Sequence, residues 1–134
     1  MDTSSTFEKL DIRSNDEIVR LKRSIDCSSA SALKSSAREF RDITESYIFQ
    51  YNAIIKTALK ENRPAYARSI NEGLIKELRL RAIAILEVSS QINMVYPDAA
   101  NRLHNFGLRI ANVREYLKNT EPEQRELGHI DLAG

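Results

Sequence analysis

One of the chain's two histidines lies inside a segment with a helical pattern, NRLHNFGLRIANVREY at residues 101–116. An imidazole can donate or accept a proton near neutral pH and can bind a metal ion, so His104 is the first side chain to consider for chemistry. If Leu103 marks the centre of the apolar stripe, His104 lies about 100° around the helix from it. We therefore expect His104 on the flank of a packing helix, without a chemical role.

An exposed histidine on a helical bundle is also what a histidine phosphotransfer domain uses, with a lysine three and a glycine four positions after it. In this sequence Gly107 stands three positions after His104, Leu108 four and Arg109 five. The glycine is out of register, and the cation falls on another face of the helix. A phosphorelay role through His104 is therefore the least favoured of the functions considered.

The other side chains that could catalyse a reaction or bind a metal are not arranged for it. Metal sites in helical bundles use Glu-x-x-His pairs that project inward, and the pair with this spacing, Glu126 and His129, lies outside any expected helix. Cys27 falls near a helix junction, where a small and partly buried thiol is the common case. The sequence also lacks a glycine-rich phosphate loop and a nucleophile elbow. We expect no enzyme activity, no metal and no cofactor.

The composition is that of one globular domain. The 134 residues are 42% hydrophobic and 29% charged, with a formal net charge of +1, so no strong field would attract nucleic acid or a membrane. We expect a polar leader at residues 1–13, a single domain at 14–120 and an acidic tail at 121–134. No stretch approaches the ~18 apolar residues of a membrane span, and a single cysteine fits a reducing compartment. These features favour a cytoplasmic protein.

Turn signals are scarce, which favours long helices. The chain has four glycines and three prolines, and it contains no Asn-Gly or Asp-Gly pair with which to join strands. Pro64, Pro97 and Pro122 fall where the helical patterns change phase, and each prevents the preceding helix from running through.

The first two helices are expected on either side of a serine-rich break. Ser14 and Glu17 form a capping box at the start of the first, and the second begins near Ser28 or Ser29 and runs to Asn62. One bent helix is the alternative. The second helix has the clearest apolar stripe, which consists of Leu33, Ala37, Phe40, Ile43, Tyr47, Tyr51, Ile54 and Ala58.

The third helix is expected from Pro64 to Met94 or Val95. The two residues Asn62 and Arg63 leave almost no loop, so the second and third helices should form an antiparallel hairpin. The apolar side of the third helix consists of Tyr66, Ile70, Leu74, Leu78, Ile85 and Ile92.

Within the third helix, LRLRAIAIL at residues 78–86 alternates like a strand. We reject a strand because the sequence offers no partner for it, and a lone strand is not stable. As a helix the segment is apolar nearly all round, which indicates a central helix or one that also faces a second subunit. Arg79 and Arg81 must then reach the surface or pair with carboxylates.

The fourth helix is expected to open after Pro97 with Asp98 as its N-cap and to end near Asn119. Its narrow apolar stripe consists of Ala99, Leu103, Phe106, Ile110, Val113 and Leu117. The whole pattern predicts an all-α fold, an up-down four-helix bundle with two long central antiparallel helices, and a dimer is one alternative.

Four apolar side chains are expected away from these stripes, where a partner would cover them. Phe49 lies about 160° from the stripe centre of the second helix, among polar neighbours. Leu80 and Tyr116 are also off their stripes, and Leu108 lies beside His104. An isolated exposed aromatic is the plain alternative for Phe49. Together the four residues favour a surface that binds another protein or a second copy of this chain.

Arginines on the last two helices allow one alternative function. Arg68 and Arg79 are eleven positions apart and share a face, and Arg102 and Arg109, seven apart, also align. Such a stripe could contact phosphates, but acidic residues interleave with it and no short helix-turn-helix is present. A nucleic-acid-associated regulator is therefore the alternative. The leading interpretation is a non-enzymatic protein-protein interaction module: an adaptor, a small chaperone, or a regulatory or assembly subunit that self-associates.

Overall fold

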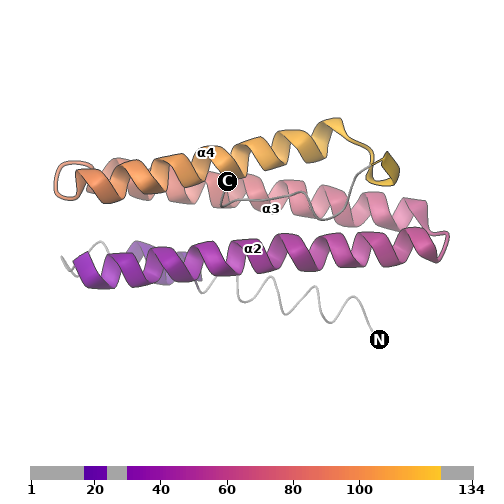
Figure 1. The fold of residues 1–134 in the computed structure, drawn as a ribbon, viewed down its shortest axis with the longest axis horizontal. Coiled ribbons are helices and arrows are strands. Elements are labelled where there is room, and N and C mark those ends of the chain that lie inside the picture. The colour runs from indigo at the N-terminus through magenta and orange to yellow at the C-terminus, as the bar shows by residue number, and fades with distance from the viewer. Residues whose placement is uncertain (1–16, 24–29, 125–134) are drawn as a thin grey trace.

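The computed structural model describes residues 17–23 and 30–124. All regular structure within these residues is helical, and the elements are a segment at 17–23, α2 at Ala30–Lys60, α3 at Pro64–Ile92, α4 at Pro97–Asn119 and the 3-10 helix η1 at Pro122–Gln124. The three long helices lie side by side and alternate in direction (Figure 1). The predicted all-helical bundle is confirmed.

Several features predicted from the sequence fall outside the described residues. These are the leader at 1–13, the capping Ser14, the break near Ser28 and Ser29, and the acidic tail from residue 125 onward. Cys27 and His129 are also outside the described residues.

The turn between α2 and α3 depends on Asn62. Its φ of 58° is left-handed, a conformation that asparagine adopts more readily than most residues. The amide of Arg63 donates to the Ala58 carbonyl at 2.8 Å, and the amide of Asn62 donates to the Leu59 carbonyl at 3.1 Å. These are the two bonds of a Schellman motif. Pro64 then occupies the first turn of α3, where its missing N–H costs nothing, and the predicted antiparallel hairpin follows.

The start of α4 corrects the predicted cap. α4 begins at Pro97, its N-cap is Tyr96, and no side chain caps it. Asp98, which the sequence predicted as the N-cap, lies in the first turn, where its carboxylate is near the positive end of the helix dipole. Proline is favoured at the first position because it has no N–H that needs a partner. α3 ends at Ile92, slightly before the predicted end at Met94 or Val95.

α3 is the central helix of the described structure. It packs along both α2 and α4 and lies between them in Figure 1. Residues 78–86 are helical throughout, so the strand was correctly rejected. The side chains at the centre of the core come from the predicted stripes, and they include Leu33, Phe40, Tyr47, Tyr51, Leu74, Leu78, Ile85, Leu103, Phe106, Ile110 and Leu117.

α3 and α4 approach each other closely at Gly107. A Cβ atom added there would lie 2.7 Å from Leu86 Cδ2 and 2.9 Å from Ile85 Cγ2. Both distances are shorter than atoms in a close-packed interior tolerate. Gly107 therefore has a packing role between α3 and α4.

Replacing Gly107 by leucine tests this close approach. Leucine favours helix over glycine by at most about 1 kcal/mol, whereas forcing a large side chain into a filled site costs roughly 1–3 kcal/mol and more where the backbone must shift. We expect Gly107→Leu to lower the free energy of unfolding, measured by urea denaturation, by about 2 kcal/mol. Asn105→Leu, at an exposed position of the same helix, is the control. Equal stability of the two variants would contradict the packing role.

Candidate functional site

The largest fully buried side chain in the described structure belongs to Arg81, at the middle of α3. Glu17, in the helical segment described at 17–23, is also fully buried, and its Oε1 contacts Arg81 Nη2. On α3, Glu77 Oε1 lies 3.3 Å from Arg81 Nε. The prediction that a buried Arg81 must pair with carboxylates is confirmed, whereas Arg79 is exposed.

Residues of α2 complete the surroundings of the guanidinium. Arg81 Nη1 donates a 2.6 Å hydrogen bond to Thr44 Oγ1, and that hydroxyl donates to the Phe40 carbonyl at 2.7 Å. The centre of the guanidinium lies 5.2 Å from the ring of Phe40 and 5.2 Å from the ring of Tyr47. Both distances suit a cation-π contact, which is stronger away from water. We call Arg81 with Thr44, Glu77, Phe40 and Tyr47 the Arg81 site.

Glu17 contacts the Arg81 site from the segment at 17–23, and the sequence analysis did not predict this contact. The sequence assigned Glu17 to a capping box with Ser14, but its carboxylate contacts Arg81 on another helix. Its burial raises the pKa of the Glu17 carboxyl from its ordinary 4.5 to about 7. The attraction of Arg81 lowers this pKa in part, and the nearby carboxylates of Glu39 and Glu77 raise it further.

Residues 17–23 are held by further contacts on both sides. Leu21 is fully buried in the hydrophobic core. At the surface, Arg20 pairs with Glu39 of α2, and Lys22 Nζ lies 3.7 Å from Glu87 Oε2 of α3. The segment therefore runs beside α2 and α3, with its charged residues bridging to both.

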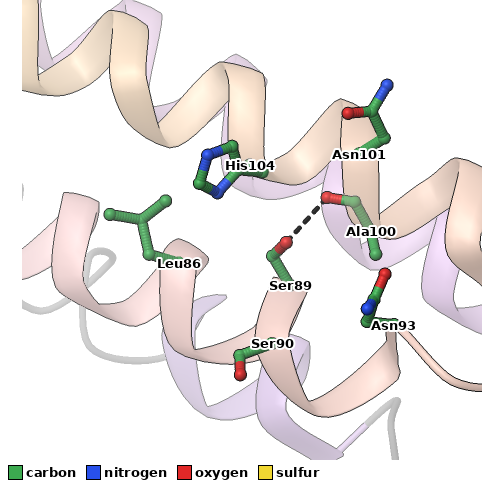
Figure 2. Close-up of a pocket in the computed structure, with 7 residues that line it drawn as sticks. All are labelled: Leu86, Ser89, Ser90, Asn93, Ala100, Asn101 and His104. Carbon is green, nitrogen blue, oxygen red and sulfur yellow. Dashed lines mark hydrogen bonds between the residues drawn. The ribbon is translucent and has the colours of Figure 1, made fainter.

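His104 lines a groove between α3 and α4. The groove has a volume of about 490 Å³, and its lining is Leu86, Ser89, Ser90, Asn93, Ala100, Asn101 and His104. Figure 2 shows the imidazole next to Leu86 and the Ser89 hydroxyl turned toward the Ala100 carbonyl, to which it donates at 2.7 Å. His104 itself is exposed, as the sequence predicted. Among the described residues, no carboxylate, cysteine or second histidine lines the groove with His104.

The four apolar residues predicted at the surface are all exposed. Phe49 of α2 has an exposed fraction of 75% and Leu80 of α3 one of 56%. Leu108 and Tyr116 of α4 are less exposed. Because they lie on three different helices, they do not form a single continuous surface by helical spacing alone.

Other exposed apolar side chains were missed by the sequence analysis. Ile83 on α3 is 51% exposed and Val19 on the first segment 46%. Met94 and Val95 lie exposed in the turn between α3 and α4. Ile83 was missed because residues 78–86 are apolar on every side, and only the packing of α2 and α4 decides which side remains uncovered.

The four arginines proposed to contact phosphates are placed on α3 and α4. Arg68 lies 3.9 Å from Glu121 and 3.4 Å from Glu123, measured between guanidinium nitrogens and carboxylate oxygens. Arg79 and Arg102 are exposed, and Arg109 is half-buried. The contacts of Arg68 also show that the first residues of the predicted acidic tail lie against α3.

Metal binding and membrane spanning have no candidate among the described residues. No group of three or more His, Cys, Asp or Glu side chains at 17–23 or 30–124 is placed to hold a metal ion. None of the helices in this part of the chain is both long and apolar enough to cross a membrane. In comparisons with known proteins, the chain matches no family model, no curated protein and no solved structure.

The buried carboxyl of Glu17 predicts a dependence of stability on pH. Below pH 4.5 the group is protonated in both the folded and the unfolded chain, and its stabilising effect is fully present. As the pH rises through about 7 the unfolded chain ionises first, so this stability is lost. We expect the free energy of unfolding to fall relative to that of Glu17→Gln, by up to roughly 3 kcal/mol, because one pKa unit corresponds to about 1.4 kcal/mol.

Urea denaturation of both proteins between pH 4 and 8 measures this difference. Glu87→Gln, which changes an exposed carboxylate facing the same segment, is the control and should follow the wild type. Parallel pH profiles for the wild type and Glu17→Gln would mean that the pKa of Glu17 is not raised by folding.

Proposed function

We propose that this chain is a non-enzymatic helical module that binds another protein through exposed apolar side chains of its bundle. An adaptor, a small chaperone, and a regulatory or assembly subunit are the forms of this function that the architecture supports. The observation that carries the proposal is a row of uncovered aliphatic side chains, Val19, Leu80 and Ile83, along the seam between residues 17–23 and α3. We call these three residues the seam patch.

The contacts of the first segment give its register along α3. Glu17 pairs with Arg81 and Lys22 with Glu87, so residues 17–23 run parallel to α3. Val19 is one turn before Lys22, and Ile83 is one turn before Glu87. This register places Val19 and Ile83 at the same level along the seam.

Leu80 extends the row along α3. It lies three positions before Ile83, on the same face of the helix, and both side chains are more than half exposed. Single exposed aliphatic residues are ordinary on a protein surface, but several in contact favour a binding surface. Lys76 and Arg79, each one turn before a patch residue, give it a basic border.

The remaining exposed apolar residues extend the surface that a partner could cover. Phe49 is the most exposed aromatic side chain that the structure describes. It lies on α2, and aromatic side chains are over-represented among the residues that dominate binding energy. A second copy of this chain is one partner that such surfaces could serve, and the oligomeric state in solution decides this.

Quantitative affinity capture tests the proposal. The wild-type chain, the double variant Leu80→Asp/Ile83→Asp and a control, Ser69→Asp, are used as baits, since Ser69 is an exposed residue of the same helix. We expect at least one protein to be retained equally by the wild type and the control and to be reduced more than tenfold on the double variant. A charge placed in an apolar interface leaves an unpaired and desolvated carboxylate, which strongly weakens binding.

Light scattering of the same three proteins accompanies the capture experiment. Self-association would appear as a dimer mass for the wild type and Ser69→Asp and a monomer mass for the double variant. A monomeric wild type whose retained proteins are the same for all three baits would remove the support for the proposal.

A further inference from the structure

The Arg81 site is assembled by α2 and α3 without any help from the first segment. Thr44 accepts a hydrogen bond from the guanidinium, Glu77 lies beside Arg81 Nε, and the rings of Phe40 and Tyr47 flank the positive charge. These four groups hold the guanidinium in place whether or not Glu17 is present. A guanidinium fixed in this way is a preorganised receptor for a carboxylate.

Residues 17–23 occupy this receptor with two buried side chains. Glu17 reaches Arg81, and Leu21, one helical turn later, is fully buried in the core. The described residues of this segment make about two helical turns. Glu17 and Leu21 fix them against α2 and α3, so the position of the segment depends on these two side chains.

The fit between Glu17 and Arg81 is incomplete. Both oxygens of Glu17, and Nε and Nη2 of Arg81, are buried without a well-aligned hydrogen bond. Glu17 Oε1 and the two guanidinium nitrogens do lie at ion-pair distance from opposite charges. Buried polar atoms without such bonds are costly, and an ion pair removed from water does not by itself repay the loss of hydration. A carboxylate that approached the guanidinium with better alignment would therefore compete with Glu17.

We propose that the surface of α2 and α3 around the Arg81 site is a binding site for an amphipathic helix of another protein, and that residues 17–23 are its resident, displaceable occupant. The partner helix carries a carboxylate four positions before a leucine, because that spacing places one side chain at Arg81 and the other in the position of Leu21. Charge complementarity selects the acid, since Arg81 Nη2 contacts the Glu17 carboxyl, whereas Glu77 and Thr44 lie beside Nε and Nη1. This site is distinct from the seam patch, and the proposal does not require the patch to bind anything.

Displacement would nevertheless affect the seam patch. Val19 belongs to the same segment as Glu17, so a partner helix at the Arg81 site would move Val19 away from α3. The two surfaces are therefore coupled: the patch is complete only while the resident segment is in place.

A synthetic peptide with the sequence of residues 12–26, labelled with a fluorophore, is the probe for this site. The full chain carrying Leu21→Asp has a weakened resident segment, and fluorescence anisotropy should show that it binds the peptide at least tenfold more tightly than the wild-type chain does. Val19→Asp is the matched control chain, because Val19 faces solvent and its change should leave the segment in place. Peptides that carry Glu17→Lys or Leu21→Asp should not bind.

Circular dichroism of the Leu21→Asp chain shows whether α2, α3 and α4 remain helical. A second measurement decides the question without that variant: NMR titration of the isotope-labelled wild-type chain with millimolar peptide. When the peptide replaces residues 17–23 at the Arg81 site, the amide signals of residues 17–23 and the Nε signal of Arg81 should shift.

Three results would contradict the proposal that the Arg81 site binds a helix of another protein. One is the absence of NMR shifts at residues 17–23 and Arg81. Another is peptide binding that survives Glu17→Lys in the peptide. The third is a wild-type dimer that Leu21→Asp dissociates, because residues 17–23 of a second copy would then be the occupant. None of these results depends on the seam patch, because each is measured at residues 17–23, at Arg81, in the peptide sequence or with Leu21→Asp.

Discussion

A positive charge buried at the centre of the bundle is the constraint around which the described structure is organised. Arg81 is fully enclosed, and an uncompensated guanidinium in that position would cost several kcal/mol. α3 can therefore be the central helix only if the neighbouring elements bring acids and polar groups to this one point. Glu77 does so from the preceding turn, Thr44 from α2 and Glu17 from the first segment.

This requirement links local structure to the surfaces available for binding. The same segment that supplies Glu17 also supplies Val19, and its register along α3 is fixed by the outer ion pair of Lys22 with Glu87. The segment that pairs with the buried Arg81 thus also places an exposed aliphatic side chain, Val19, at the level of Ile83. Loss of the Glu17–Arg81 ion pair would also alter the surface at Val19. A change at the Arg81 site and a change at the seam patch are therefore not independent.

Local sequence rules predicted the features that depend on neighbours in the chain. The apolar stripes predicted the helices and most of the core. The short Asn62–Arg63 connection before Pro64 predicted the tight turn. The apolar pattern at residues 78–86 indicated a central helix or one that faces a second subunit. The sequence analysis missed the positions of residues whose surroundings are set by parts of the chain that are far away in sequence. Glu17 fits a capping box equally well, and only the tertiary register shows that it faces Arg81. Ile83 could not be placed at the surface because a helix that is apolar on every side does not reveal which side its neighbours leave open.

We expect residues 17–23 to behave as a separable helix that the Arg81 site holds against α2 and α3. Native-state hydrogen exchange of the wild-type chain tests this directly. The backbone amides of Leu21, Lys22 and Arg23 should be protected, and they should exchange through a partial opening during which the amides in the middle of α3 stay closed. Exchange of these three amides only by global unfolding would show that the segment is not separable, and exchange as fast as in the free peptide would show that it is not held.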